Sequence, residues 1–355
     1  MRVLNRLQGK MEGAAVGSST SNSGLRPVRD REIGHSRVAA PAIRAVGLCK
    51  FYRSNWTFKV TRGLESLDLE VERGEVLGLL GPNGAGKTTT LKLLTGLLTP
   101  SAGQAWLLGV SIDETACRRS LGFLPEQPYF YDYLGGLEYL ELAAGLSGVE
   151  PREIRARASH WLDRVGLGAR PKLRLRKYSK GMLQRLGLAA ALVHEPKLLI
   201  LDEPMSGLDP LGRRDVRELI LEQKARGTTV LFSSHILPDV EALCDRAAII
   251  LDGRLRRIAP VGELVDQGVR RVLVRCEPLG IVELPAEWGS RVKREDRGGE
   301  TELHLGASDD VNRVLDWLIQ RGKAVHAVTP ERATLEALFL ATAAGASDQT
   351  DRRSA

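Results

Sequence analysis

The chain has 355 residues, of which 43% are hydrophobic and 27% charged, and its formal net charge is +7. This composition is typical of a globular protein with a buried core, and the length predicts about two domains. Its apolar runs are far shorter than the roughly 20 residues of a membrane-spanning helix, so we expect no membrane span. The basic charge fits nucleic acid, an anionic membrane or a phosphate ligand as well as scattered surface cations, but an aromatic content of 5% weakens the nucleic-acid interpretation.

Residues 1–40 contain Arg, Ser and Gly but no apolar segment of signal-peptide length, so we expect a disordered N-terminal extension. The four cysteines are dispersed along the chain, which argues against a disulfide framework and against paired metal ligands. We therefore expect reduced thiols in a cytoplasmic protein. The cysteines are Cys49, Cys117, Cys244 and Cys276.

An α/β domain is predicted over residues 41–268. Residues 43–52 and 64–75 alternate apolar and polar positions, as half-exposed antiparallel strands do. Residues 76–81 are continuously apolar, which is typical of a buried central strand. A glycine-rich loop and a helix follow that strand.

Helices dominate residues 134–193, and strands and helices then alternate to residue 259. This alternation predicts a mostly parallel sheet covered by helices, with a helical subdomain at about 130–180. The predicted strands are 197–204, 228–235 and a hairpin at 246–259 that turns at Asp252-Gly253, and the predicted helices between them are 210–226 and 236–244.

Residues 269–345 have a different pattern, which predicts a strand, a hairpin, a helix, a strand and a final helix. We expect a small α+β accessory domain, and we find no catalytic signature in it. Residues 346–355 are expected to be a flexible tail.

The segment "GPNGAGKT" at residues 81–88 fits the phosphate-loop pattern G-x-x-x-x-G-K-[ST], and it lies between a buried strand and a helix as that motif requires. Lys87 can reach the β- and γ-phosphates of a nucleotide, and the Thr88 hydroxyl can ligate Mg²⁺. The sequence therefore predicts a nucleotide site. The glycines that let the backbone face a phosphate chain are Gly81, Gly84 and Gly86.

A second acid for the metal is supplied by "LLILDEP", in which four apolar residues precede Asp202. We expect Asp202 to hold Mg²⁺, usually through water, and the adjacent Glu203 to polarise a water for attack on the γ-phosphate. His235 ends another predicted parallel strand, so we expect it to reach the same edge of the sheet. His160 and His194 lie on helices without such partners and are interpreted as structural.

Together these motifs resemble an ABC-type ATPase, the nucleotide-binding subunit of ABC transporters, over about residues 43–265. The resemblance implies an α/β fold: a P-loop NTPase whose mixed sheet carries an antiparallel β subdomain and a helical insertion. It implies ATP and Mg²⁺ as cofactors, with Lys87, Glu203 and His235 catalytic. In this sequence "GPNGAGKTT" looks like the Walker A motif, "LLILDEP" the Walker B, "SGLD" (206–209) the D-loop and "SSH" the switch histidine.

The resemblance also implies which residues contact ATP. Tyr52 matches the aromatic residue that stacks on adenine. The whole Walker A segment is implied to bind the phosphates, namely Gly81, Pro82, Asn83, Gly84, Ala85, Gly86, Lys87, Thr88 and Thr89.

The segment "YSKGMLQR" at residues 178–185 is a polar turn that begins an apolar helix, an arrangement that suits an anion but contains no acid or base. It resembles the family's signature sequence, with Lys180 and Met182 where the common form has Gly and Gln. The resemblance implies that Ser179 and Gly181 cover an ATP held by a second subunit. The protein is then expected to form a head-to-tail homodimer with two ATP molecules sandwiched between subunits.

The Q-loop departs from the family pattern. In "LGFLPEQPYFYDYL" (121–134), Glu126 aligns with the usual glutamine and Gln127 follows one position later. Either residue can serve the ATP site, and Glu126 is a further candidate ligand of Mg²⁺.

Since the chain contains one ATPase unit and no membrane span, the resemblance implies a separate integral membrane permease as partner and a location at the inner face of the cell membrane. The sequence is similar to ATPase subunits of bacterial exporters. Four aromatic residues are then expected to line the groove for the permease's coupling helix or, alternatively, to pack locally in the core: Tyr129, Phe130, Tyr131 and Tyr133.

An alternative is an ABC ATPase that acts on ribosomes or nucleic acid. The translation-factor type carries two ATPase units, and the DNA-repair type carries long coiled coils or zinc motifs. The sequence shows neither pattern, so no nucleic-acid partner is expected. A GTPase is disfavoured because the sequence has no N-K-x-D guanine motif.

Overall fold

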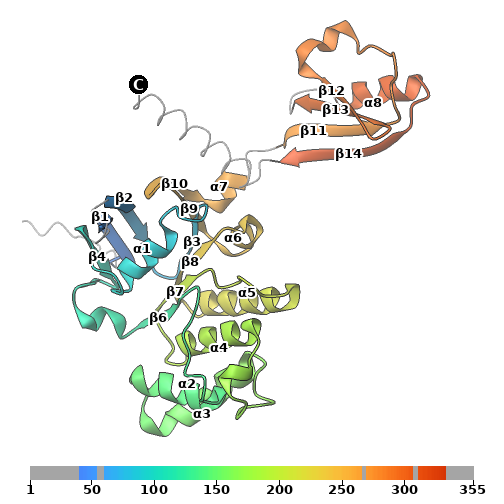
Figure 1. Cartoon of the computed structure of the whole chain (residues 1–355). Coiled ribbons are helices and arrows are strands. Elements are labelled where there is room, and N and C mark those ends of the chain that lie inside the picture. Colours follow the sequence, from blue (N-terminus) through green and yellow to red (C-terminus); the bar gives the residue numbers. More distant parts are fainter. Residues whose placement is uncertain (1–39, 54–59, 266–268, 307–310, 333–355) are drawn as a thin grey trace, which may run out of the picture. The chain divides into compact units, whose positions relative to one another are not determined.

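The computed structural model describes residues 40–53, 60–265, 269–306 and 311–332. These residues form a larger body (residues 40–265) and a smaller body (residues 269–332), which are described separately (Figure 1). The predicted N-terminal extension, the final helix and the tail lie outside the described residues.

The larger body contains an antiparallel sheet of order β2-β1-β4-β5. Its strands alternate buried and exposed residues in β1 and β2, as the sequence predicts. Strand β4 was not predicted, although its second half alternates in the same way. The strands are β1 (Ile43–Arg53), β2 (Val60–Val71), β4 (Ala102–Leu107) and β5 (Val110–Ser111).

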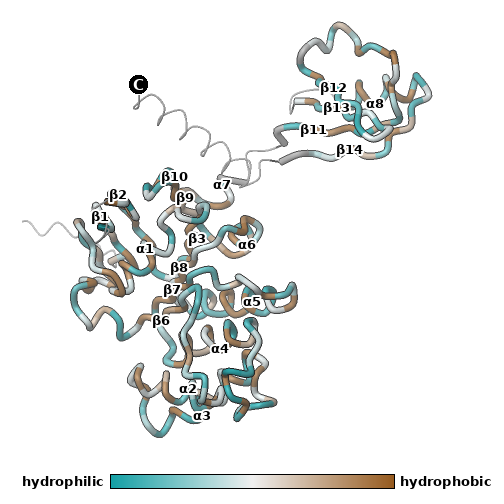
Figure 2. The backbone as a smooth tube through the Cα atoms, viewed as in Figure 1, coloured by the Kyte–Doolittle hydropathy of each residue, from teal (hydrophilic) through white to brown (hydrophobic). Residues whose placement is uncertain are grey.

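A six-stranded sheet of order β10-β9-β3-β8-β7-β6 lies at the centre of the larger body. Neighbouring strands from β9 to β6 are parallel, and β10 pairs antiparallel to β9. Figure 2 shows hydrophobic residues along these central strands, and β3, β7 and β8 are buried throughout. The strands are β3 (Val76–Leu80), β6 (Leu121–Leu124), β7 (Leu198–Asp202), β8 (Thr229–Ser234), β9 (Arg246–Leu251) and β10 (Arg254–Pro260).

The predicted helices are present with shifted ends. A Pro at the first helical position and an N-cap carboxylate from Asp209 define the start of α5. The helices of the larger body are α1 (Lys87–Leu94), α2 (Gly136–Leu146), α3 (Pro151–Arg164), α4 (Lys180–Leu192), α5 (Pro210–Ala225), α6 (Leu237–Leu243) and α7 (Val261–Val265), with 3₁₀ turns η1 (Thr115–Arg118) and η2 (Leu175–Lys177).

Helices α2 and α3 pack with α4, and their buried residues join the core that also covers one face of the central sheet. Trp161 and Leu162 of α3 belong to this core, as does Leu140 of α2. The helical subdomain is therefore tied to the sheet through α4, whose N-terminus carries the signature-like segment.

The smaller body has its own sheet and its own hydrophobic core. All neighbouring strands in the order β12-β13-β11-β14 are antiparallel, with α8 between β13 and β14 in the chain. This is the split β-α-β-β-α-β arrangement of ferredoxin-like units, with the first helix reduced to the 3₁₀ segment η3. The elements are β11 (Val269–Cys276), η3 (Ala286–Arg291), β12 (Lys293–Arg297), β13 (Glu300–Gly306), α8 (Val311–Gln320) and β14 (Val325–Arg332).

Candidate nucleotide site

The phosphate loop joins β3 to α1. Gly86 has φ 107°, in the left-handed region, and a Cβ atom there would lie 2.7 Å from the Gly63 carbonyl oxygen. A Cβ atom at Gly81 would lie 2.4 Å from the Ile250 carbonyl oxygen. Since a side chain at either position would clash with backbone, the loop can take this shape only with glycine, and it ends at the amide-rich start of a helix.

Lys87 is the first residue of α1, and its side chain is only 6% exposed. Its Nζ atom donates to the Gly81 carbonyl at 2.7 Å and to the Pro82 carbonyl at 3.4 Å, and it lies 3.5 Å from Glu203 Oε1. The ammonium is therefore held over the loop on the side of the Walker B-like strand, where a bound phosphate chain can replace the carbonyl contacts.

Asp202 ends β7 and is almost fully buried. Its Oδ1 atom accepts hydrogen bonds from Ser233 Oγ at 2.7 Å and Thr88 Oγ1 at 3.2 Å. Within the described residues, Oδ2 is buried without a hydrogen-bond partner. A buried carboxylate oxygen without a partner is costly, and a hard cation or its bound water would satisfy it, so Asp202 and Thr88 fit Mg²⁺.

Glu203 follows Asp202 with φ 50°, a backbone conformation uncommon outside glycine. Its amide donates to Ser233 Oγ at 2.9 Å, which fixes this turn to the neighbouring strand β8. The side chain is 10% exposed, and Oε2 lies 2.9 Å from His235 Nδ1. Glu203 thus bridges the Lys87 ammonium and the His235 ring, and its carboxylate can accept a proton from a water placed between them.

Lys87, Glu203 and His235 line one cavity of about 550 Å³, within the size range of small-ligand sites, and Asp202 lies behind it. Tyr52 lies at this cavity, 39% exposed, with its hydroxyl 3.2 Å from Thr89 Oγ1. A Cβ atom at Gly63 would lie 2.4 Å from the Tyr52 ring, so glycine there leaves room for it. The lining residues are Tyr52, Thr61, Arg62, Gly63, Pro82, Asn83, Gly84, Gly86, Lys87, Thr88, Thr89, Glu126, Glu203, Ser206 and His235.

The two Q-loop candidates differ in position. Both are exposed, but Glu126 lines the cavity and Gln127 does not. Three further lining residues, Thr61, Arg62 and Gly63, were not predicted, because they come from β2 and belong to no motif. Ser206, the first residue of the D-loop-like segment, also lines the cavity.

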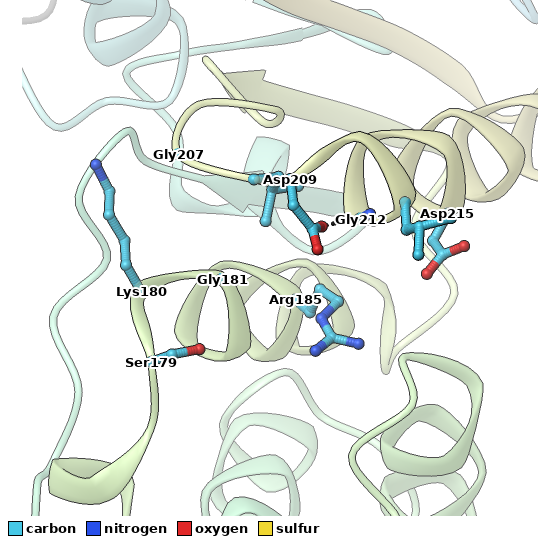
Figure 3. Close-up of a pocket in the computed structure, with 10 residues that line it drawn as sticks. Ser179, Lys180, Gly181, Arg185, Gly207, Asp209, Gly212 and Asp215 are labelled. Carbon is cyan, nitrogen blue, oxygen red and sulfur yellow. Dashed lines mark hydrogen bonds between the residues drawn. The ribbon is translucent and has the colours of Figure 1, made fainter.

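The signature-like segment lines a separate pocket of about 440 Å³ between the start of α4 and the loop before α5 (Figure 3). Ser179 caps α4, and its hydroxyl accepts a hydrogen bond from the Met182 amide at 3.2 Å. The Lys180 stem passes Gly207, where a Cβ atom would lie 2.8 Å from Lys180 Cε. Ser179 and Gly181 do not line the cavity that contains Lys87, so one chain presents the two predicted halves of the ATP site in different places.

Tyr178 precedes the cap and is 8% exposed. Burial raises the pKa of its phenol, so the side chain stays neutral and packs with the helical subdomain.

Gln184 is a site residue that sequence reasoning missed. It is 3% exposed on α4, and its Nε2 donates to the Pro204 carbonyl at 3.1 Å and the Glu203 carbonyl at 3.4 Å. It therefore ties the signature-like helix to the turn that carries Glu203. The only signal in the sequence was a polar residue within an apolar helix.

The family model described as ABC transporter matches residues 64–206. An uncharacterized ABC transporter ATP-binding protein of Nostoc sp. is 50% identical over 221 residues, 61% of this chain and 66% of the relative. Another uncharacterized one, of Bacillus subtilis, is 36% identical over 282 residues, 78% of this chain and 89% of the relative. The bacitracin transport ATP-binding protein of Bacillus licheniformis is 39% identical over 225 residues, 62% of this chain and 71% of the relative.

Solved structures agree in fold. An ATP-binding subunit of an ABC transporter is 34% identical with a TM-score of 0.57, covering 63% of this chain and 91% of that one. A dimeric ATP-binding cassette bound to ADP and Pi is 23% identical with a TM-score of 0.58, covering 62% of this chain and 98% of that one. No helix among the described residues has the length and hydropathy to cross a bilayer.

Proposed function

The chain belongs to the ATP-binding proteins of ABC transporters, and we propose that it hydrolyses ATP to drive a separate membrane permease, as an exporter subunit. The observation that carries the proposal is the convergence of Lys87, Glu203 and His235 at one cavity, at the carboxyl ends of three adjacent parallel strands. Asp202 is buried behind this cavity and accepts a hydrogen bond from Thr88, which lines it.

ATP binds with its phosphates on the loop at residues 81–86, where backbone amides and the Lys87 ammonium neutralise their charge. Thr88 and Asp202 hold Mg²⁺, which supplies charge neutralisation of the β- and γ-phosphates when bound. Tyr52 receives the adenine at the rim of the cavity.

Glu203 orients the attacking water and takes up its proton, because its carboxylate is almost buried and lies between Lys87 and His235. His235 holds the carboxylate through Nδ1 and, being 53% exposed, can also face the γ-phosphate. Ser233 fixes both acids, since it donates to Asp202 and accepts from the Glu203 amide.

The site is completed by a second copy of the chain. Ser179 and Gly181 form a helix start with an anion-ready cap but lie in a pocket away from Lys87, so they serve the γ-phosphate of the other subunit's ATP. The dimeric relative bound to ADP and Pi supports this arrangement. ATP then joins the two subunits, and hydrolysis releases them.

We propose that the permease docks at a groove of about 180 Å³ beside β6 and α4, because residues of the segment 121–134, including Pro125 and Pro128, line it. Pro128 and Tyr139 line this groove, but none of the four aromatic residues expected there does so. Phe130 instead packs against Tyr139 with ring centroids 4.9 Å apart, so for this residue the packing alternative describes the structure. The name of the bacitracin transport relative supports a role in transport.

The proposal is tested by purifying the chain with the product of a neighbouring gene that has about six hydrophobic spans. ATPase activity should rise when the pair is assembled in a membrane. A chain that hydrolyses ATP but sediments with ribosomes and binds no membrane protein would overturn the transport role.

A further inference from the structure

A surface of the helical subdomain is formed by two segments that lie side by side. The Leu175 amide donates to the Leu134 carbonyl at 2.9 Å, and the Arg176 amide donates to the Asp132 carbonyl at 3.2 Å. The Leu137 amide donates to the Pro171 carbonyl at 3.2 Å. These backbone hydrogen bonds hold residues 170–177 against residues 131–137, so the backbone that carries this surface is fixed by the fold.

Five cations are exposed along the second segment. They include Arg174, which forms a β-bridge with Gly135, and they alternate in part with less exposed residues such as Leu173 and Leu175. None of the ion pairs found among the described residues involves these cations. The five exposed cations are Arg170, Lys172, Arg174, Arg176 and Lys177. Five exposed like charges within eight residues create a positive potential that attracts an anionic surface.

Two exposed tyrosines belong to the first segment. Tyr131 is 54% exposed and Tyr133 is 66% exposed, and their ring centroids lie 5.9 Å apart. A tyrosine ring has an apolar body and a polar tip, which suits the interface between water and the lipid headgroups.

Two carboxylates lie in the same region. Asp132 is exposed beside the tyrosines, and Glu138 accepts a hydrogen bond from the Gly135 amide at 2.7 Å as part of the start of α2. The five cations outnumber them, so the surface keeps a positive excess.

We propose that this basic–tyrosine patch, formed by the five cations with Tyr131 and Tyr133, binds the anionic phospholipid headgroups of the membrane surface. The inference rests on the proposed function, which brings the subunit to a membrane. The patch lines none of the nucleotide cavity, the signature pocket or the permease groove. It is thus an additional contact, made directly with lipid, that holds the subunit near its permease and orients it. Cations beside tyrosines fit a charged interface with an apolar layer beneath it, and the proposed function places such an interface next to the subunit.

The test is sedimentation of the full chain, without permease or nucleotide, with phosphatidylcholine vesicles that contain or lack phosphatidylglycerol. The protein should sediment only with the anionic vesicles, and high salt should release it because the headgroup attraction is screened. Changing Arg170, Lys172, Arg174 and Arg176 to Gln should lower the partition coefficient at least about tenfold.

A matched control removes the same charge elsewhere in the larger body, from four exposed cations that are in no ion pair among the described residues. This variant should change the partition coefficient less than about twofold. Arginine-to-lysine changes at 170, 174 and 176 should retain binding, which separates charge from folding. The control substitutions are Arg119→Gln, Lys197→Gln, Arg226→Gln and Arg257→Gln.

Equal loss in both glutamine variants, or equal sedimentation with neutral vesicles, would overturn the proposal. Displacement of the protein from anionic vesicles by single-stranded RNA would also overturn the proposal, if the RNA acts at a lower phosphate concentration than that of the vesicles. Such a result would favour nucleic acid as the ligand. ATPase activity is measured separately: its absence from the native chain would contradict the proposed function, whereas only the vesicle experiment decides the patch.

Discussion

Two helices of this molecule, α1 and α4, have N-termini suited to binding phosphate, and the side chains around these two N-termini differ. At α1, Lys87 lies beside Glu203, which contacts His235, so a cation and a proton acceptor meet at one cavity, with the buried acid Asp202 behind Thr88. At α4, Ser179 caps the helix, and both acids in that pocket have partners: Asp209 caps α5, and Asp215 pairs with Arg214 at 3.9 Å. This difference is the basis for the proposal that the first region performs chemistry and the second recognises a phosphate brought by another molecule.

The largest effect is expected from Glu203→Gln. The amide keeps the shape of the side chain but cannot take a proton, so turnover should fall about 10³-fold. ATP affinity should be retained, because the phosphate loop and Lys87 are unchanged. Phosphate release and binding of a fluorescent ATP analogue measure the two quantities, with the exposed Glu218→Gln as a control of native activity. Native turnover in the Glu203 variant would remove Glu203 as the base.

Ser179→Arg tests the proposed phosphate contact at the start of α4. A long cation at the cap of α4 should block the approach of a second subunit's phosphate and lower turnover about 10²-fold, while ATP binding by the monomer stays within about twofold of native. Titration of the monomer with ATP and a turnover assay separate the effects. A parallel loss of ATP affinity would mean that Ser179 serves its own chain's nucleotide.

His235→Ala tests the contribution of the His235 contact with Glu203 to turnover. Loss of the contact to Glu203 Oε2 should lower turnover about 10- to 10²-fold without altering ATP affinity. Replacement by Gln, which can still donate a hydrogen bond, should restore part of the rate. Equal rates for Ala and Gln would argue against a hydrogen-bonding role.

Gln184→Leu tests the link between the two regions. Removal of the buried amide leaves the Pro204 and Glu203 carbonyls without their donor, which should lower the free energy of unfolding by about 1–3 kcal/mol. Urea unfolding measures this change. The exposed Gln127→Leu is the matched control and should change stability by less than about 0.5 kcal/mol. Equal changes would show that the buried contact does not stabilise the fold.

The smallest effect is expected at the Q-loop. Because Glu126 lines the cavity and Gln127 does not, Glu126→Ala should raise the Mg²⁺ concentration needed for half-maximal turnover a few-fold, on the order of the loss of one outer ligand contact. Gln127→Ala should leave it unchanged. The reverse result would assign the role to Gln127.

Much of the first region could be predicted from sequence, because each part is local. The glycine pattern at 81–86, the apolar run before Asp202 and the strand before His235 each specify a strand and the turn that ends it. Parallel pairing of β3, β8 and β7 then brings the three turns together.

The contacts between distant segments could not be predicted in the same way. Gly63 makes room for Tyr52, and Gln184 holds the turn at Glu203, but each has this role only because the fold brings two separate elements into contact. The pairing of residues 131–137 with 170–177, which builds the basic–tyrosine patch, is of the same kind. Strand β6 was missed because its four residues are too few for a clear alternation.

The central claim is that the α4 helix start of one chain completes the ATP site of another. Light scattering of the Glu203→Gln variant on a size-exclusion column, with and without ATP and Mg²⁺, tests it most directly. We expect the Glu203→Gln variant to be a monomer of 38.8 kDa without ATP and a dimer with ATP. The double variant with Ser179→Arg should be a monomer under both conditions. A dimer that persists in the double variant, or a monomer that binds ATP and never associates, would contradict it.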